Sequence, residues 1–165
     1  MNLKKTSKIS GISIAACVFC VFTFQTEVFA MSFFGLKLCV FSAVEGKVLR
    51  EGKPIPNALV KRTYDWDGEN ITDEVTTDDD GNFSFNNQYQ KSLFAIFPHN
   101  PSVGQFIKIY IDDKEYQAWG FQKGNYDVNG ELDGKPMKLL CDLDSPKQTH
   151  KASEFKNYVG ICELR

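Results

Sequence analysis

Short apolar runs with a period of two residues, separated by turn signals, constrain the fold of this chain more than any other feature. From Leu36 onward these runs recur at intervals of roughly 8 to 12 residues, which is the strand spacing of a β-sandwich. In the segment 58–66, Val60, Tyr64 and Trp66 fall on one face and polar residues alternate with them. No long stretch has the period of an amphipathic helix. The pattern predicts an all-β, Greek-key β-sandwich of about seven strands.

Each predicted strand is bounded by glycine, proline, asparagine or acidic residues that favour turns. The expected strands are 36–49 (one or two strands, with a break or bulge at Gly46), 58–66, 71–77, 83–85, 93–97, 107–111, 115–121, 137–143 and 158–164. Asp67-Gly68 is a strong hairpin signal. The run 93–97 is continuously apolar, as in a central strand covered on both faces. Residues 122–136 lack an apolar period and predict a long loop.

The first thirty residues have the layout of a secretory signal peptide. Three lysines precede an apolar run at 9–24, and polar residues then lead to Val28-Phe29-Ala30, which has the small final residue of a cleavage site. Cleavage between Ala30 and Met31 leaves residues 31–165 as a single β-sandwich domain outside the cytoplasm. We therefore expect a secreted or periplasmic protein.

Two other interpretations of this leader stay open. Residues 14–17 (Ile-Ala-Ala-Cys) resemble a bacterial lipobox, which would make Cys17 the lipidated N-terminus of an anchored lipoprotein. Alternatively, Met31 is an internal start, and the protein is cytoplasmic. A retained membrane anchor is disfavoured, because a span needs about 20 apolar residues and polar residues interrupt the run 9–24. We expect no stable membrane span in the mature form.

The charge of the chain argues against one class of partner. There are 19 basic and 21 acidic residues, and loss of residues 1–30 removes three lysines and one glutamate, which leaves a formal charge of −4. The basic residues are scattered along the chain, whereas a nucleic-acid-binding protein concentrates them on one face. We therefore expect no nucleic-acid partner.

Three cysteines remain beyond the leader. Cys141 and Cys162 lie in short apolar runs that can pair as neighbouring strands, so a disulfide between them is the leading prediction in an oxidising compartment. Cys39 would then be buried and free. Pairing of Cys39 with either of the others stays open, because sequence does not fix disulfide connectivity.

Two ordered motifs resemble a known superfamily. They are Gly46-Lys47-Val48 followed by residues 52–60 (GKPIPNALV), and then residues 77–85 (TDDDGNFSF). Together they resemble the carboxypeptidase-regulatory-like, transthyretin-like domains, and the resemblance implies a seven-stranded Greek-key sandwich with a non-catalytic role. Further segments resemble a bacterial family catalogued only as a domain of unknown function: 94–100, 116–119 and 138–143.

Alternating oxygen-bearing side chains in the predicted long loop form a weak calcium candidate. The four residues are Asp127, Asn129, Glu131 and Asp133. Calcium needs several converging oxygen ligands, and the two glycines nearby let a backbone fold around an ion. However, the stretch lacks the glycine at the sixth position of an EF-type loop, so an ordinary double turn is the competing interpretation. We expect no metal or other cofactor.

No catalytic signature appears in the sequence. The chain has two histidines, His99 and His150, and no G-x-S-x-G elbow or closely spaced zinc ligands. An enzyme would need His99 to approach a carboxylate and a nucleophile in one pocket. We therefore expect a protein without enzymatic activity.

Two aromatic residues are predicted to be exposed anchors for a partner. Trp66 lies beside the Asp67-Gly68 turn, and Tyr126 lies within the long loop. The leading prediction is an exported module that binds a protein partner through its loops or a strand edge. The alternatives are a carbohydrate- or calcium-binding accessory domain, and an immunity or accessory protein of a bacterial secretion system. The sequence gives neither the identity of the partner nor the oligomeric state.

Overall fold

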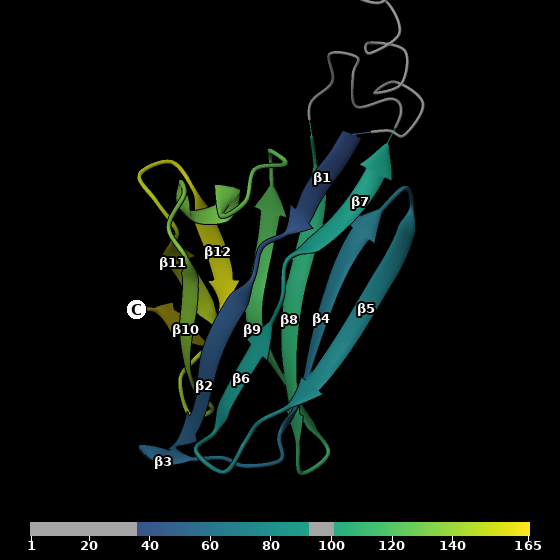
Figure 1. Cartoon of the computed structure of the whole chain (residues 1–165). Coiled ribbons are helices and arrows are strands. Elements are labelled where there is room, and N and C mark those ends of the chain that lie inside the picture. The colour runs from purple at the N-terminus through teal and green to yellow at the C-terminus, as the bar shows by residue number, and fades with distance from the viewer. Residues whose placement is uncertain (1–35, 93–100) are drawn as a thin grey trace, which may run out of the picture. The chain divides into compact units, whose positions relative to one another are not determined.

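The computed structural model describes residues 36–92 and 101–165 (Figure 1). The chain divides into two compact units, residues 37–90 with 98–165 and residues 1–36 with 91–97. Nearly all described residues belong to the first unit, which is the β-domain. Several predictions lie outside the described residues: the signal peptide, its cleavage site at Ala30 and Met31, the lipobox ending at Cys17, the apolar run 93–97 and His99.

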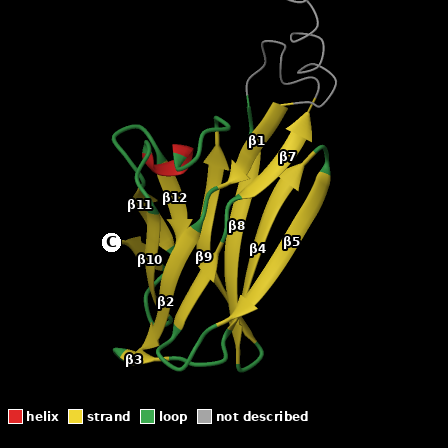
Figure 2. Cartoon of the chain, in the orientation of Figure 1, coloured by secondary structure: helices red, strands yellow, loops and turns green. Residues whose placement is uncertain are grey.

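Strands form almost the whole of the described domain, as Figure 2 shows. The first sheet is antiparallel and has the order β5 (Glu69–Thr76), β4 (Leu59–Trp66), β8 (Val103–Ile111), β9 (Lys114–Lys123). The second sheet has the order β13 (Cys162–Leu164), β10 (Met137–Asp142), β2 (Val44–Arg50), β3 (Lys53–Pro54), and β6 (Asn82–Phe85) also pairs with β2. Two further pairs are β1 (Leu36–Phe41) with β7 (Gln88–Ser92) and β11 (Gln148–Lys151) with β12 (Asn157–Gly160). The predicted all-β sandwich is confirmed.

The core contains the inward-facing residues of both sheets, as the period of two predicts. Val60 on β4, Ile107 and Ile109 on β8 and Trp119 on β9 are all fully buried. They face the second sheet, whose β2 contributes the buried Val48. Because strands alternate their side chains between two faces, burying one face leaves the other polar face in water.

Arg62 departs from this pattern, because it is charged and yet lies on the inner face of β4 with no exposed surface. Its guanidinium donates two hydrogen bonds to the Asp73 carboxylate, at 2.9 and 2.6 Å, and one to the Asn86 carbonyl at 2.7 Å. It also lies 4.5 Å from the centre of the Phe85 ring. These partners compensate the loss of hydration, since a buried charge is tolerated when it is paired and hydrogen-bonded.

Three strand predictions differ from the structure. The single closing strand expected at 158–164 is two strands, since β12 pairs with β11 and β13 pairs with β10. The polar segments of β7 and β11 are strands that carry no apolar alternation. Gly46 is not a break, because β2 runs through it and the Phe83 ring of β6 lies directly over it, where a β-carbon would be 2.2 Å from that ring.

The predicted long loop between β9 and β10 is present and contains one turn of 3-10 helix, Gly130–Leu132. Its flanking residues Asn129 and Asp133 both have the left-handed backbone conformation, with φ of 57° and 54°. Asparagine and aspartate tolerate this conformation better than most residues. None of the helical segments in the described part of the chain has the length and apolar character needed to cross a membrane.

Candidate functional site

Trp66 and Tyr126, the two predicted anchors, contact each other. Their ring centroids are 5.9 Å apart and their planes are inclined by 68°, an edge-to-face arrangement. Both residues are half-buried and pack against the core. The pair is therefore partly structural, and it does not present two open ring faces on which a sugar could stack. A role of either residue in partner binding stays a prediction.

The four calcium candidates do not converge. Glu131 points into the interior and forms an ion pair with Lys123, while Asp133 forms one with Lys156 near the surface. The Asn129 backbone amide donates to the Ser42 hydroxyl, and the Asp127 carbonyl accepts from Lys123. In the described ranges, no three His, Cys, Asp or Glu residues are grouped so that they could hold a metal ion. The loop is held by lysines, so its geometry does not favour calcium, and the calcium interpretation stays a prediction.

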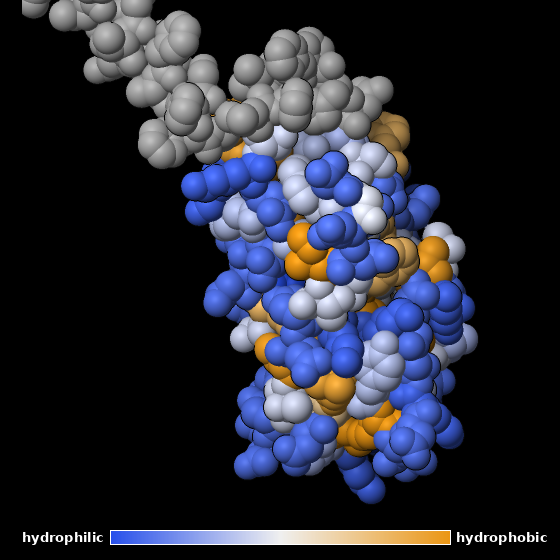
Figure 3. Space-filling view, turned by 90° about the vertical axis from the view of Figure 1, so that its right-hand side faces the viewer, coloured by the Kyte–Doolittle hydropathy of each residue, from blue (hydrophilic) through white to orange (hydrophobic). Residues whose placement is uncertain are grey.

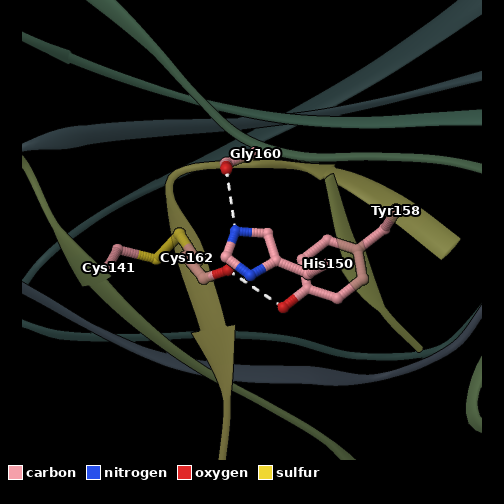
Figure 4. The surroundings of a disulfide bond; sticks show 5 residues. All are labelled: Cys141, His150, Tyr158, Gly160 and Cys162. Carbon is pink, nitrogen blue, oxygen red and sulfur yellow. Dashed lines mark hydrogen bonds between the residues drawn. A yellow bond between two sulfur atoms is a disulfide. The ribbon is translucent and has the colours of Figure 1, made fainter. Parts of the chain in front are cut away.

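Cys141 and Cys162 lie opposite each other on β10 and β13, with their sulfur atoms 1.97 Å apart in a disulfide (Figure 4). This is the pair that the sequence favoured, and Cys39 is buried and free. His150, also drawn in Figure 4, stacks on the Tyr158 ring, with 4.9 Å between the ring centroids. One nitrogen of the His150 ring is 3.1 Å from the Gly160 carbonyl oxygen. Both contacts hold the C-terminal strands together.

A buried ion pair that the sequence analysis missed lies under the long loop. Lys123 Nζ is 3.0 Å from Glu131 Oε2, and both side chains are fully buried. The Ser42 backbone amide and hydroxyl both donate to the Glu131 carboxylate, at 3.0 and 2.6 Å. The Gln105 amide group donates to it at 2.8 Å. The carboxylate therefore has a complete set of donors without water.

These contacts determine how Glu131 titrates. Burial by itself raises the pKa of the Glu131 carboxyl, but the Lys123 charge and the hydrogen bonds from Ser42 and Gln105 outweigh it and lower the pKa below the ordinary value. By contrast, burial raises the pKa of the nearby Cys39 thiol, whose sulfur is 4.0 Å from Lys123 Nζ. The cluster thus holds an ionised carboxylate and a protonated thiol.

This cluster does not support hydrolytic catalysis. Ser42 Oγ is 3.3 Å from Lys123 Nζ, a separation typical of a nucleophile and its base. However, the Ser42 hydroxyl donates to Glu131, and Ser42, Lys123 and Glu131 are all fully buried. A substrate carbonyl cannot approach a hydroxyl that has no exposed surface. The cluster connects the long loop to the β1–β2 junction instead.

One sequence signal could have indicated part of this cluster. The period of two along β9 places Trp119, Phe121 and Lys123 on the same inner face, so a lysine at an inward position predicts a buried charge. Its partner could not be inferred in the same way. Glu131 lies in a loop without a period, and Ser42 is 89 residues from it in sequence.

A second surface feature is the open edge of β5. This strand is at the end of its sheet and pairs only with β4 among the strands of the described residues. The Asp67-Gly68 turn has positive φ at both residues, 54° and 80°, as in a two-residue type I′ hairpin. From its closing pair, Trp66 and Glu69, hydrogen-bonded and non-hydrogen-bonded pairs alternate along the strands.

This alternation shows which backbone groups of β5 are directed away from β4. They belong to four residues, all with exposed side chains: Asn70, Thr72, Glu74 and Thr76. The hydroxyl oxygens of Thr63 and Thr72 are 2.9 Å apart, as expected for the closer side chains of a non-hydrogen-bonded pair. The side of the domain shown in Figure 3 is mainly hydrophilic, with separate apolar spots. The edge thus offers a row of backbone donors and acceptors in a polar setting.

Acidic side chains dominate this edge. β5 carries Glu69, Asp73 and Glu74 and no basic residue. Within the sheet, Asp73 pairs with Arg62 and Glu74 pairs with Lys61. Each of these pairs joins β5 to β4, so they stabilise the hairpin. They do not use the outward-facing backbone groups of β5, which stay available to another strand.

The family of this chain is shown by a match to a protein-family model. The model of a family described as a domain of unknown function, DUF6795, matches residues 44–146. This range covers more than half of the chain, from the start of β2 to beyond β10. It includes the β5 edge, Lys123 and Glu131, whereas Ser42 and Cys162 lie outside it. No curated protein matches the chain.

Proposed function

The chain belongs to the DUF6795 family, and we propose that it is a non-enzymatic, exported module that binds a protein partner along the open edge of β5. The family description states no activity, so the proposal depends on the structure. The observation that supports it most directly is an eight-residue strand with one unpaired edge. An extended segment of a partner can add to such an edge through main-chain hydrogen bonds.

The charges of β5 favour a different protein over a second copy of this chain. Two copies of β5 paired edge to edge would bring their acidic side chains into proximity, and like charges across a strand pair are destabilising. A partner strand that carries lysine or arginine would instead place opposite charges beside Glu69 and the exposed Glu74. We therefore propose a basic, extended segment of another protein as the partner.

The compartment and the finer fold type belong to the same proposal. The Cys141–Cys162 disulfide supports an oxidising compartment, which agrees with secretion or a periplasmic location after cleavage at Ala30. The second resembling motif forms a turn with Gly81 at a φ of 75° and continues into β6. Its placement supports the transthyretin-like type of sandwich that the motifs imply.

Substitution of Thr72 by proline tests the β5 edge. Proline removes an outward-facing backbone N–H and is tolerated on edge strands, so we expect the hairpin to form and partner binding to be lost. Thr72→Val is the matched control, because it removes the hydroxyl and keeps the N–H. The measurement is capture of partners by the immobilised mature chain from an extract of the native cells, compared among the wild type and the two variants.

Hydrogen exchange of the wild-type chain gives an independent measurement. The amides of Asn70, Thr72 and Glu74 should exchange quickly in the free protein and slowly once the captured partner is added. The amides of Ile71 and Asp73 face β4 and should be protected in both states. Equal capture by Thr72→Pro and the wild type, or no change in these amides, would remove β5 as the binding edge.

A further inference from the structure

Glu131 bridges a lysine amine and a glutamine carboxamide inside the domain. One oxygen of its carboxylate, Oε2, is 3.0 Å from Lys123 Nζ, and the other, Oε1, accepts a hydrogen bond of 2.8 Å from Gln105 Nε2. All three side chains are fully buried. A potential nucleophile and a potential leaving group thus share one carboxylate in a site from which water is excluded.

The sheet register brings the lysine and the glutamine within reach of each other. Gln105 on β8 lies opposite Phe121 on β9, and Lys123 lies two residues further along β9, opposite Val103. Such diagonal neighbours on one sheet face are about 7 to 8 Å apart at the backbone and remain within reach of long side chains. Both side chains are on the inner face.

The Gln105 carboxamide has a fixed orientation. Its Nε2 donates to the Val40 carbonyl at 2.8 Å as well as to Glu131, which identifies the nitrogen side of the group. Its Oε1 is buried and has no hydrogen-bond partner in the described part of the chain. Buried acceptors are nearly always satisfied, so an unsatisfied one at this position requires an explanation.

We propose that Lys123 and Gln105 form an intramolecular isopeptide bond, with Glu131 as the proton carrier. Lys123 transfers a proton to Glu131, and its neutral amine attacks the side-chain carbonyl carbon of Gln105. A new N–C bond forms, Glu131 protonates the carboxamide nitrogen, and the old C–N bond breaks to release ammonia. Glu131 then takes the second proton of the attacking nitrogen and passes it to the released ammonia, which leaves as ammonium. The side chains lose one ammonia in total, and the step needs no oxidant, metal or other reactant.

Burial favours this reaction because it excludes water that would compete with the amine for the carboxamide carbon. Glu131 becomes a donor after it accepts the proton, and it then lies beside the carboxamide whose oxygen has no partner.

The chain contains a natural comparison pair. Lys147 Nζ donates directly to Gln117 Oε1 at 2.7 Å, but this contact is exposed. Solvent reaches this contact, so water competes with the Lys147 amine for the carboxamide. If contact between a lysine and a glutamine were sufficient, this second pair would react as readily as the first. The proposal requires the reaction at Gln105 only.

Intact-mass measurement of the folded, full mature chain tests the proposal, which does not depend on the β5 edge. The expected mass is lower by one ammonia than the sequence with its one disulfide predicts. Protease digestion after reduction should then give a branched peptide that joins Gln105 to Lys123. Gln117 and Lys147 should be found in unmodified peptides.

Two variants distinguish the proposed Lys123–Gln105 bond from other reactions that release ammonia. In Glu131→Gln the proton carrier is absent, so the branched peptide should disappear while the peptides containing Lys123 and Gln105 regain their full masses. Glu115→Gln, a change of the same size at an exposed glutamate, should leave the branched peptide unchanged. Cyclisation at Asn129-Gly130 also releases ammonia, but it gives no branched peptide. A wild-type chain of full mass with both residues unmodified would overturn the proposal, whether or not the variants fold.

Discussion

The same pair of charges, a lysine and a glutamate, occurs in two very different regions of this domain. Lys123–Glu131 under the long loop and Lys61–Glu74 on the β5 hairpin have nearly equal N···O distances, 3.0 and 3.1 Å. Their side-chain exposures differ, 0% and 0% against 37% and 57%. Burial and the additional donors around the carboxylate therefore distinguish the pairs, while distance does not.

This difference determines what each region can do. A buried pair is costly to break, because either partner left alone is an uncompensated charge without water. An exposed pair exchanges its partner for water at little cost, so the backbone edge beside it stays available. The buried pair therefore stabilises the end of the domain that contains the long loop. The β5 hairpin is the region that we propose to bind a partner.

The largest expected effect comes from Glu131→Ala. This change prevents the proposed bond and leaves the Lys123 amine buried without its carboxylate, and we expect the free energy of unfolding to fall by about 3 to 5 kcal/mol. Urea unfolding followed by tryptophan fluorescence measures it. A loss below about 1 kcal/mol would show that water enters the cluster, and the contrast between the two regions would disappear.

Removal of the disulfide should have the next largest effect. Cys141→Ser with Cys162→Ser opens a loop with a sequence separation of 21 residues, and the expected loss is about 3 kcal/mol in a chain-entropy model. The disulfide links β13 to β10 of the second sheet. Without it, amide hydrogen exchange should increase mainly in β11 to β13 and less in β5. A uniform increase across both regions would show that the domain unfolds as one unit from this end.

Acid should lower the stability of the wild type more than the stability of a variant that lacks the Glu131 carboxylate. Before the proposed bond forms, the charged Lys123 amine helps to lower the pKa of Glu131 on folding, so the Glu131 contribution to stability is present above the ordinary glutamate pKa of 4.5 and is lost as the pH falls below it. Glu131→Gln should therefore show a flatter decline of stability over that acid range than the wild type. Parallel curves for the two proteins, from urea unfolding at a series of pH values, would contradict the assignment.

The smallest effect is expected from Glu74→Gln on the hairpin. The pair with Lys61 is exposed, so we expect a loss of less than about 1 kcal/mol that decreases further at high salt. The same urea titration measures it, with Glu131→Ala as the reference. A loss comparable to that of the buried pair would mean that the edge of β5 is covered, and would count against its role as a docking edge.

The sequence predicted the strands that have one solvent-exposed face and one buried face. β4, β8, β9 and β10 follow the apolar alternation closely, because the period of two is a local property of side-chain direction. β7 and β11 were not predicted, since their pairing depends on partners distant in sequence and their own residues are polar. The sequence favoured the Cys141–Cys162 pair, because each cysteine lies in a short apolar segment near the C-terminus, but it left pairing with Cys39 open.

The candidate sites show the same difference between local sequence patterns and contacts of distant segments. Acidic spacing around Asp127 indicated a cation site, but the loop turns Glu131 inward to Lys123, and no local pattern encodes that choice. The open edge of β5 was equally invisible, because a strand is an edge only once the order of the sheet is known.

The sequence by itself determined that this chain forms an all-β sandwich, since alternation, turn residues and aromatic content act within a few residues of each other. Only the tertiary structure decided which charges are buried and which strand remains open. Those properties depend on contacts between segments such as Ser42 and Glu131, which are 89 residues apart. Burial changes the energy of a charge far more than any neighbour in sequence does, so the candidate functional features of this protein arise where distant segments meet.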